Sequence, residues 1–523
     1  LPQQWIALDF LSEQTKFIVF KMDKNLGPAI IERDMYIHRA LADHLSDATT
    51  YRQLTSAEAE GRIRAIALII KAFLKRFFPA PPPEEADREP DLVKVHRVFL
   101  TRSLNTIKDP FSYFYLLAKI HKTPWATRPI VSCSGSILHG LGRWVDDRLQ
   151  IICRHLPYAL RSSTDLVTAL AALGPLPATA TMFTCDAVSM YTNIDTQHAL
   201  NEIKTFLMTS PIPQQEGVDA RALLAALHII MEHNVFRFGD THWIQLSGTA
   251  MGTPPAPMYA TLYFAIYEAR ILPKYPELKF YRRYIDDGFG IWEPDPLLPP
   301  AQTLLRWGEL QADFNQYGTH TGRLRWDFSL QQTTIDFLDL TIMISVGNPI
   351  DTRLYEKALN LYLYLPPASA HPPGVLKGLI YGGCCRIHRL TTCPLLRRQY
   401  VQRFYERLLA RGYASTTVVP LINTAVSRLS APTTPLVGTA PPLRPLFLHV
   451  DYHPEDSTSQ DIQRAFRCDL LQPRNPDCPF DRLTMAYHRP QNLGNLVSPC
   501  RLPTTGISVS EVLARDFPPA PLP

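Results

Sequence analysis

Apolar and polar residues alternate in short segments along the first part of the chain, and these segments predict both strands and helices. Within residues 16–37, two apolar runs flank the polar turn Asp23–Pro28, which predicts a β-hairpin with a charged tip. Residues 38–78 have apolar residues at helical spacing, and a Pro-rich run ends this predicted helical region. Residues 114–132 have the order strand, basic turn, strand, and residues 137–172 are again helical in pattern.

The pattern continues with strands that end in polar residues. An apolar strand ends at Asp186, and a loop of small residues and Pro leads into a helix over residues 261–271. Residues 324–328 and 334–342 predict two more strands, and residues 374–412 form a basic segment with helical periodicity.

Residues 281–292 hold two adjacent carboxylates between short aromatic and β-branched runs. Such runs favour strands, and Asp-Gly is a strong hairpin signal, so we predict a β-hairpin with Asp286 and Asp287 at its tip. An ordinary surface turn explains the same residues.

Composition narrows the class of protein. A chain of 523 residues predicts two to four domains, and 47 Pro residues are about twice the average usage. The net charge of +5 is modest, but basic clusters fit a polyanionic partner. Nine scattered cysteines without a signal peptide favour a reduced intracellular compartment, and the sequence contains no apolar run long enough to span a bilayer. The basic clusters are Lys71–Arg76, Lys119–Arg128, Arg386–Arg411 and Arg464–Arg489.

The carboxylates form the first set of candidate chemical groups. Asp186 at a strand end and the Asp286-Asp287 hairpin could bring three carboxylates together, as in a two-metal site for phosphoryl transfer. Mg²⁺ prefers such oxygen ligands and keeps substrate phosphates as the others. A lone Asp at the position of Asp186 is more often a helix cap.

The basic turn forms the second set. Lys119, Lys122 and Arg128 lie in the predicted strand–turn–strand segment, and three cations there suit a triphosphate. A solvated basic loop is the alternative.

Taken in order, the motifs resemble those of a known family. Phe183-Thr184-Cys185-Asp186 with Tyr191, Ala250-Met251-Gly252-Thr253-Pro254 with Pro257, and Tyr284-Ile285-Asp286-Asp287 resemble palm motifs A, B and C of reverse transcriptases. Further stretches resemble the reverse transcriptase of Penelope-like retroelements, which is akin to telomerase catalytic subunits. These are Asp23–Pro28, Leu116–Pro124 with Arg128-Pro129-Ile130, Phe337–Leu340, and His371–Gly374. The resemblance covers residues 15–420, and Asn25 stands where the family's Asp-Lys-Gly element has Gly.

The resemblance implies roles for individual residues. Asp186, Asp286 and Asp287 would be catalytic and would bind two Mg²⁺ ions, for which Mn²⁺ can substitute, with the Ala187 carbonyl as a further ligand. Tyr191 would exclude the 2′-hydroxyl of the incoming nucleotide. The other implied contacts are Lys119, Lys122 and Arg128 on the triphosphate, Met251 and Gly252 at the nascent base pair, and Phe337, Leu338 and Lys357 at the primer and template.

The resemblance also implies a fold and partners. We expect an α+β right-hand polymerase whose palm is an antiparallel sheet, with fingers and a helical thumb. Its function would be RNA-directed DNA synthesis from an RNA template, a DNA primer and dNTPs, on an RNA–DNA hybrid in the nucleus and away from membranes. The expected segments are an N-terminal extension (1–110), fingers and palm (111–345), thumb (346–430) and a Pro-rich C-terminal extension (431–523).

Several alternatives stay open at this stage. We find no GIY-YIG endonuclease motif before Pro523, so the nuclease is either truncated away or absent, as in a branch that primes at chromosome ends. A domesticated copy that binds nucleic acid without catalysis and an RNA-templated RNA polymerase or terminal transferase are the rivals. The cysteines and histidine of Cys384–Cys393 do not have the usual spacing of a zinc site.

Overall fold

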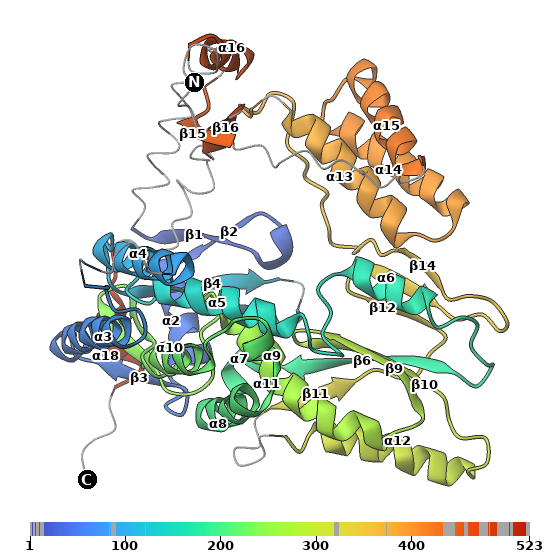
Figure 1. Cartoon of the computed structure of the whole chain (residues 1–523), viewed down its shortest axis with the longest axis horizontal. Helices are drawn as coiled ribbons and strands as arrows, with labels where there is room; N and C mark the ends of the chain where they lie inside the picture. The colour runs from blue at the N-terminus through green and yellow to red at the C-terminus, as the bar shows by residue number, and fades with distance from the viewer. Residues whose placement is uncertain are drawn as a thin grey trace. The chain divides into compact units, whose positions relative to one another are not determined.

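The computed structural model describes residues 15–518 except 83, 85–89, 121, 318–323, 373, 432–444, 454–458, 470–479, 481, 489–500 and 503–505, together with residues 3, 6 and 10. The chain divides into two compact units (Figure 1). Unit 1 comprises Leu1–Ile350, Tyr355–Asn360 and Val497–Pro523, and unit 2 comprises Asp351–Leu354 and Leu361–Leu496. The four segments expected from the sequence remain a prediction, because they divide the chain by function rather than by contacts.

An antiparallel four-stranded sheet forms one half of unit 1. Its strand order is β11 (Arg325–Phe328), β6 (Thr181–Val188), β10 (Asp287–Trp292) and β9 (Leu278–Tyr284). Its inward side chains, among them Phe183, Trp292 and Trp326, share a large apolar core with helices of unit 1. The predicted strand ending near Asp186 and the predicted hairpin are therefore neighbours in one sheet.

A five-stranded sheet forms the other half. Its order is β3 (Tyr51–Leu54), β8 (Thr241–Gln245), β7 (Val235–Phe238), β4 (Ser112–Lys119) and β5 (Ala126–Ser132). The β4–β5 pair is the predicted strand–turn–strand segment. The expectation of helix throughout residues 38–78 is wrong for β3, which pairs with β8 far along the chain. This segment has four residues, which is too short for its pattern of apolar and polar residues to predict a strand, and the pairing with β8 stabilises it.

The predicted N-terminal hairpin is confirmed. Strands β1 (Phe17–Lys21) and β2 (Pro28–Glu32) pair antiparallel, and the short helical turn η1 (Asp23–Asn25) lies at the tip. A second hairpin, β12 (Thr334–Phe337) and β13 (Leu340–Met343), is also present.

The helices of unit 1 fill the space around and between these strands (Figure 1). They are α2 (Arg33–Ala40), η2 (Leu41–Leu45), α3 (Ser56–Phe77), α4 (Asp91–Asn105), α5 (His139–Cys153), α6 (Ser163–Ala171), α7 (Met190–Asn193), α8 (Thr196–Thr209), α9 (Ile212–Gln215), α10 (Ala220–Glu232), α11 (Ala256–Ile271), η4 (Leu272–Lys274), α12 (Pro300–Phe314) and α18 (Val509–Asp516). Asp195 caps α8 by accepting from the His198 N–H at 2.8 Å.

Helix α18 returns to the N-terminal region and completes an apolar core there. Val509 and Val512 are fully buried with residues of the five-stranded sheet and α2. The Arg33 Nε donates to the Ile507 carbonyl at 2.8 Å, and the Val509 N–H donates to Asp240 at 2.9 Å. The sequence left residues 431–523 without a fold, so this contact is a new finding, although much of that segment lies outside the described residues.

Unit 2 is mostly helical, as the basic periodic segment predicts. Ile380, Leu408 and Val418 are buried where its three main helices meet. Its elements are β14 (Asp351–Leu354), α13 (Val375–Leu390), α14 (Pro394–Ala410), α15 (Ser415–Ser430), β15 (Pro445–Asp451), α16 (Ser459–Asp469) and β16 (Arg482–His488). Across both units, the described helices include none with the length and apolar content needed to cross a bilayer.

Candidate active site

The pairing of β6 with β10 brings the predicted carboxylates to one end of the four-stranded sheet. Asp186 lies directly opposite Asp287 in the register. The Ala187 N–H donates to the Asp286 carbonyl at 2.9 Å, so the turn before β10 is also fixed to β6. Asp186 is therefore part of a strand that joins the hairpin, and the helix-cap alternative does not apply to it.

The turn lies one residue earlier than the predicted tip, which comprised Asp286 and Asp287. Tyr284 pairs with Asp287, so Ile285 and Asp286 form the turn and only Asp286 is at its tip. Gly288 lies within β10, where an added Cβ would be 2.5 Å from the Cys185 Sγ. That glycine therefore permits close approach of two strands rather than making the turn.

The turn has an unusual backbone that a buried arginine holds in place. Ile285 has φ of +55°, a region that β-branched residues rarely adopt. The Arg283 Nη1 donates to the Ile285 carbonyl at 2.6 Å, and its Nη2 donates to the Thr261 carbonyl at 3.0 Å. The strained turn is thereby tied to α11.

Glu268 on α11 neutralises that arginine. The Arg283 Nε lies 2.5 Å from the Glu268 Oε1, its Nη2 lies 2.8 Å from Oε2, and both side chains are 0% exposed. The Tyr281 hydroxyl donates to Glu268 at 2.9 Å. Burial alone would lower the pKa of Arg283, but Glu268 raises it overall, so Arg283 remains charged. The sequence analysis missed this pair; the available signal was one charge at an inward position of each apolar element.

Negative charge gathers at the carboxylate end. Burial, followed by the charges of Asp286 and Asp186, raises the pKa of Asp287 to about 6. Burial also raises the pKa of Asp186 and of Asp286. Asp327 on β11 lies opposite Asp186 and adds to the rise at Asp186; it is an acidic neighbour that the motifs did not identify.

The donor chemistry of this cluster fits a hard divalent cation. The carboxylates of Asp186, Asp286 and Asp287 and the carbonyl of Ala187 supply oxygen, and a cation would relieve the repulsion that raises their pKa values. The described part of the chain contains no three His, Cys, Asp or Glu side chains close enough together to hold a metal ion as they stand.

Tyr191 lies beside the carboxylates, on α7. Its ring is partly buried, and burial, followed by the charge of Asp286, raises the pKa of its hydroxyl to about 12. The Thr249 N–H donates to the Tyr191 carbonyl at 2.6 Å, and a Cβ on Gly248, which has φ of +75°, would lie 2.4 Å from that carbonyl. The glycine thus allows the loop before α11 to pack directly on the tyrosine backbone.

Met251 and Gly252 lie against β5. The Val131 N–H donates to the Met251 carbonyl at 2.8 Å. Gly252 has φ of +121°, and an added Cβ would lie 2.6 Å from the Val131 carbonyl. Gly252 therefore permits its backbone to approach β5 closely. The contact of Gly252 with the nascent base pair remains a prediction.

The three predicted phosphate-binding cations lie at the β4–β5 end of the five-stranded sheet. Lys119 ends β4, Arg128 pairs with Leu117 across the hairpin, and Lys122 is in the connecting turn. Lys119 and Arg128 stabilise the ionised form of Asp286. Lys119 and Lys122 stabilise the ionised form of Asp186. The cations and the carboxylates thus act on one another electrostatically.

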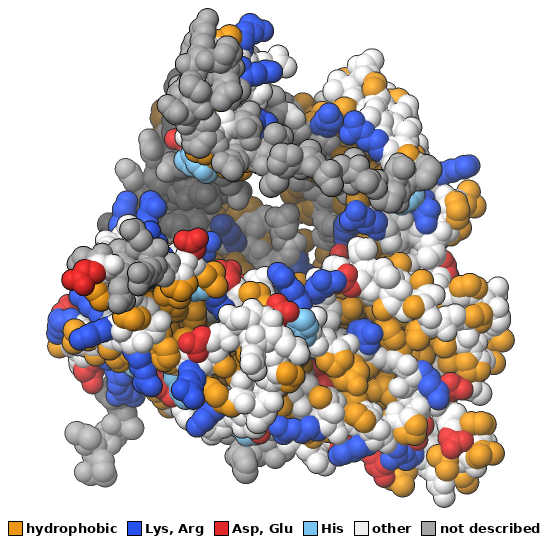
Figure 2. Space-filling model, in the orientation of Figure 1, with side chains coloured by type: hydrophobic (Ala, Val, Ile, Leu, Met, Phe, Trp, Pro, Cys, Tyr) orange, Lys and Arg blue, Asp and Glu red, His pale blue; other side chains and the backbone are white. Residues whose placement is uncertain are grey.

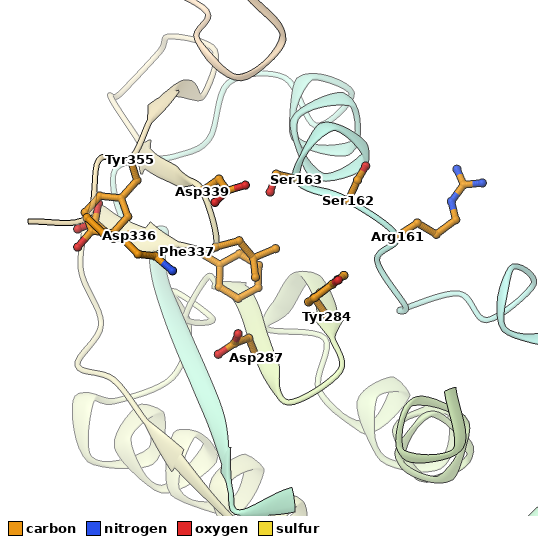
Figure 3. A pocket seen from close by; sticks show the side chains of 11 residues that line it. Arg161, Ser162, Ser163, Tyr284, Asp287, Asp336, Phe337, Asp339 and Tyr355 are labelled. Atoms are coloured by element: carbon orange, nitrogen blue, oxygen red, sulfur yellow. The ribbon is translucent and has the colours of Figure 1, made fainter. Parts of the chain in front are cut away.

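The predicted primer contacts line a cavity of about 630 Å³ that also reaches Asp287 (Figure 3). Phe337 is buried against the ring of Phe289, and Leu338, with φ of +54°, makes the β12–β13 turn. The wall is made by Tyr284, Asp336, Phe337, Leu338, Asp339, Tyr355, Lys357 and the residues Arg161, Ser162 and Ser163 at the start of α6. In Figure 3, Arg161 points away from the other labelled side chains.

The Cys384–Cys393 region of unit 2 contains free cysteines. Cys384 is buried in α13, whereas Cys385 and Cys393 are partly exposed. Neither this region nor any other described part of the chain holds three His, Cys, Asp or Glu side chains grouped as metal ligands.

Comparison with solved structures reveals similarity to polymerases. The telomerase of Candida albicans in complex with a TWJ fragment of telomeric RNA matches with a TM-score of 0.50 at 9% identity, over 80% of this chain and 66% of that one. Apo telomerase from Candida tropicalis matches with a TM-score of 0.44 at 8% identity, over 79% and 67%. Sicinivirus 3Dpol RNA-dependent RNA polymerase matches with a TM-score of 0.41 at 9% identity, over 80% and 95%.

The chain has a right-hand polymerase fold. The α+β right-hand fold predicted from the sequence is thereby confirmed. No family model and no curated protein matches the sequence of this polymerase-like protein. It spans just under two thirds of the length of the Candida albicans telomerase, so the likeness concerns the fold.

Proposed function

We propose that this chain is an RNA-directed DNA polymerase of a Penelope-like retroelement. The observation that carries the proposal is the register of Asp186 opposite Asp287, within electrostatic reach of Lys119 and Arg128, in a right-hand polymerase fold. Carboxylates that bind metal and cations that bind phosphate are the two requirements of nucleotidyl transfer. The template would be RNA, the primer DNA and the substrates dNTPs, and the enzyme would act in the nucleus on chromosomal DNA such as chromosome ends.

In this proposal the protein positions reactants and balances charge. Asp186, Asp286, Asp287 and the Ala187 carbonyl would hold two Mg²⁺ ions, whose chemistry when bound is to stabilise the attacking and leaving oxygens. Lys119, Lys122 and Arg128 would neutralise the triphosphate as the primer 3′-hydroxyl displaces pyrophosphate from the α-phosphorus.

The ring of Tyr191 would select the sugar. Its backbone is held by the Thr249 N–H and by the close approach of Gly248, which would keep the root of the side chain in place. A ring held in this way would leave no room for a 2′-hydroxyl. Tyr191→Ala should therefore raise ribonucleotide incorporation about tenfold to a hundredfold, as for other steric discriminations.

Each unit offers a separate surface for nucleic acid, and in unit 1 that surface would be the pocket beside Asp287. Phe337, Leu338 and Lys357 would contact the primer and template from the β12–β13 side. In unit 2, Lys and Arg side chains are prominent over α13–α15 (Figure 2), which suits the backbone of an RNA–DNA hybrid.

Primer extension tests the proposal. The intact chain should extend a DNA primer on an RNA template with dNTPs and Mg²⁺, and Asp286→Ala/Asp287→Ala should reduce extension by at least a thousandfold. Asp91→Ala, at an exposed first-turn position of α4, is the matched control and should retain activity. Extension that survives the double substitution would refute the site, and extension with rNTPs alone would identify an RNA polymerase instead. Nucleic-acid binding without any extension would favour the inactive copy.

A further inference from the structure

The tip of the N-terminal hairpin has no role in the function proposed above, yet it is fixed beside the cations of β4 and β5. Ile18 and Phe20 of β1 are buried in one apolar cluster with Leu116 and Ala118 of β4. Met22 forms a bridge with Ala118, and its N–H donates to the Gly27 carbonyl at 3.0 Å, which closes the tip. The tip is therefore part of the five-stranded half of unit 1 rather than a separate arm.

Asp23 at this tip faces Arg128. The side chain of Asp23 is 11% exposed, and its Oδ2 lies 3.4 Å from the Arg128 Nη2. Tight charge-assisted pairs are shorter, about 2.7–2.9 Å. Both the Oδ2 of Asp23 and the Nε of Arg128 are buried without a hydrogen-bond partner in the described structure. The pair is oriented but leaves hydrogen-bonding capacity on the guanidinium.

Positive charge at this point exceeds negative charge. Lys24 adds a fourth cation to Lys119, Lys122 and Arg128, and within the described residues Asp23 is the single carboxylate that forms an ion pair with any of them. Burial lowers the pKa of Lys119, and repulsion from Arg128, Lys122 and Lys24 lowers it further against the opposing effect of Asp23. Lys24 is exposed and has φ of +60°, so the tip holds it in a conformation that non-glycine residues adopt rarely. An anion is the ligand that such a cluster would bind.

We propose that Asp23 and Lys24 belong to the nucleotide site: Lys24 contacts the outer phosphates of the incoming triphosphate, and Asp23 is a positioning residue that orients the Arg128 guanidinium. This proposal rests on the proposed polymerase function and extends its phosphate site to the hairpin. It gives a specific task to the charged tip that the sequence predicts for this hairpin.

Steady-state primer extension and direct pyrophosphate binding test the proposal together. Lys24→Ala should raise the KM for dNTP about tenfold with little change in kcat, and should weaken pyrophosphate binding by a similar factor, because one charge-assisted contact is lost. Lys21→Ala is the matched control, since Lys21 is an exposed lysine of the same hairpin. It should change neither quantity.

A double-mutant cycle tests the role of Asp23. Asp23→Ala should raise the KM for dNTP several-fold in the intact chain but should add nothing in an Arg128→Ala background, because the two residues act through one guanidinium. Lys24→Ala should remain additive with Arg128→Ala. Additive effects of Asp23→Ala and Arg128→Ala would refute the positioning role.

Other outcomes separate the hypotheses. If Lys24→Ala raised the KM for primer–template and left the KM for dNTP and pyrophosphate binding unchanged, the tip would bind nucleic acid and the proposal would be wrong. If the intact chain extended no primer, yet pyrophosphate bound and Lys24→Ala weakened that binding, the polymerase function would fail while the phosphate site would stand.

Discussion

The two sides of the candidate site are built in opposite ways. The acidic side comprises β6 and the β9–β10 turn. There the guanidinium of Arg283, which holds the turn, is fully buried and binds Glu268 and two backbone carbonyls. On the cationic side, defined as the ends of β4 and β5 with the hairpin tip, Arg128 has one long ion pair and is partly exposed. A buried arginine with all its partners is fixed, whereas a half-exposed one with spare donors can take a new partner.

The difference follows from what each side would do. Carboxylates that hold metal ions must keep their places through every cycle, so a rigid support suits them. Cations that bind a triphosphate must release pyrophosphate each time, and a site with weak internal pairing can do so.

The largest effect should come from Arg283 on the acidic side. Arg283→Met should lower the free energy of unfolding by about 3–5 kcal/mol, because it leaves Glu268 charged and unpaired in the core. Activity should fall by at least a hundredfold, since the Ile285 turn loses its anchor. Denaturant unfolding and single-turnover extension measure the two effects, and Arg282→Met, a change at the neighbouring half-exposed residue, is the control.

A second variant separates stability from positioning. Arg283→Met/Glu268→Leu should recover most of the lost stability, because an apolar pair can replace a buried ion pair. It should not recover activity, since no side chain would then hold the Ile285 carbonyl. Full recovery of activity would show that the pair serves the core alone, and the contrast between the two sides would fail.

An intermediate effect should come from α18, which supports the cationic side from behind. Val512 is fully buried in the cluster that contains Leu116 and Ala118. Val512→Ala should lower the free energy of unfolding by roughly 2 kcal/mol and raise the KM for dNTP more than it changes kcat. Ala514→Ser, at an exposed position of the same helix, is the control. An unchanged unfolding free energy would mean that the helix is dispensable to the sheet.

The smallest effect should be a pH dependence of stability near β5. His44 contacts Thr127 at 2.7 Å, and burial lowers its pKa from 6.5 to about 4 against the opposing charge of Asp43. The unfolded chain would therefore take up this proton first, so the contribution of His44 to stability is present above pH 6.5 and is lost as the pH falls from 6.5 towards 4.

The measurement is a comparison of unfolding midpoints. As the pH falls from 6.5 to 4, the free energy of unfolding of the wild type should decrease by on the order of 1–2 kcal/mol more than that of His44→Gln. The glutamine side chain of that variant does not titrate. Parallel pH curves for the two proteins would contradict the prediction. The carboxylates also titrate in this range, and the difference between the two proteins removes their common contribution.

The sequence was most informative where chemistry and local pattern coincide. The strand at Asp186, the hairpin at Asp286 and Asp287, and the β4–β5 pair could all be predicted, because each combines a short apolar period with unusual polar residues. The turn was misplaced by one residue because Ile285 adopts a left-handed conformation that the local sequence disfavours. Arg283 holds the Ile285 carbonyl in that turn and is itself bound to Glu268 and Thr261 of α11, which are distant in sequence.

Features that depend on distant pairing could not be predicted. Strand β3 has four residues and owes its structure to β8. Glu268 and Arg283 looked like isolated charges in apolar elements, and nothing local shows that they meet. The packing of Val509 and Val512 on the N-terminal half requires tertiary contacts that no periodicity reveals.

The bond between Arg33 and Ile507 joins residues 474 positions apart, and this separation sets an order of assembly during synthesis. At about 5–20 residues per second, a ribosome needs roughly 25–95 seconds to make the chain between them. The strands that hold Asp186 and Asp287 can pair well before that time has passed. The apolar face behind Lys119 and Arg128 stays uncovered until the valines of α18 arrive, so a nascent chain would acquire its acidic groups first and its complete phosphate site last.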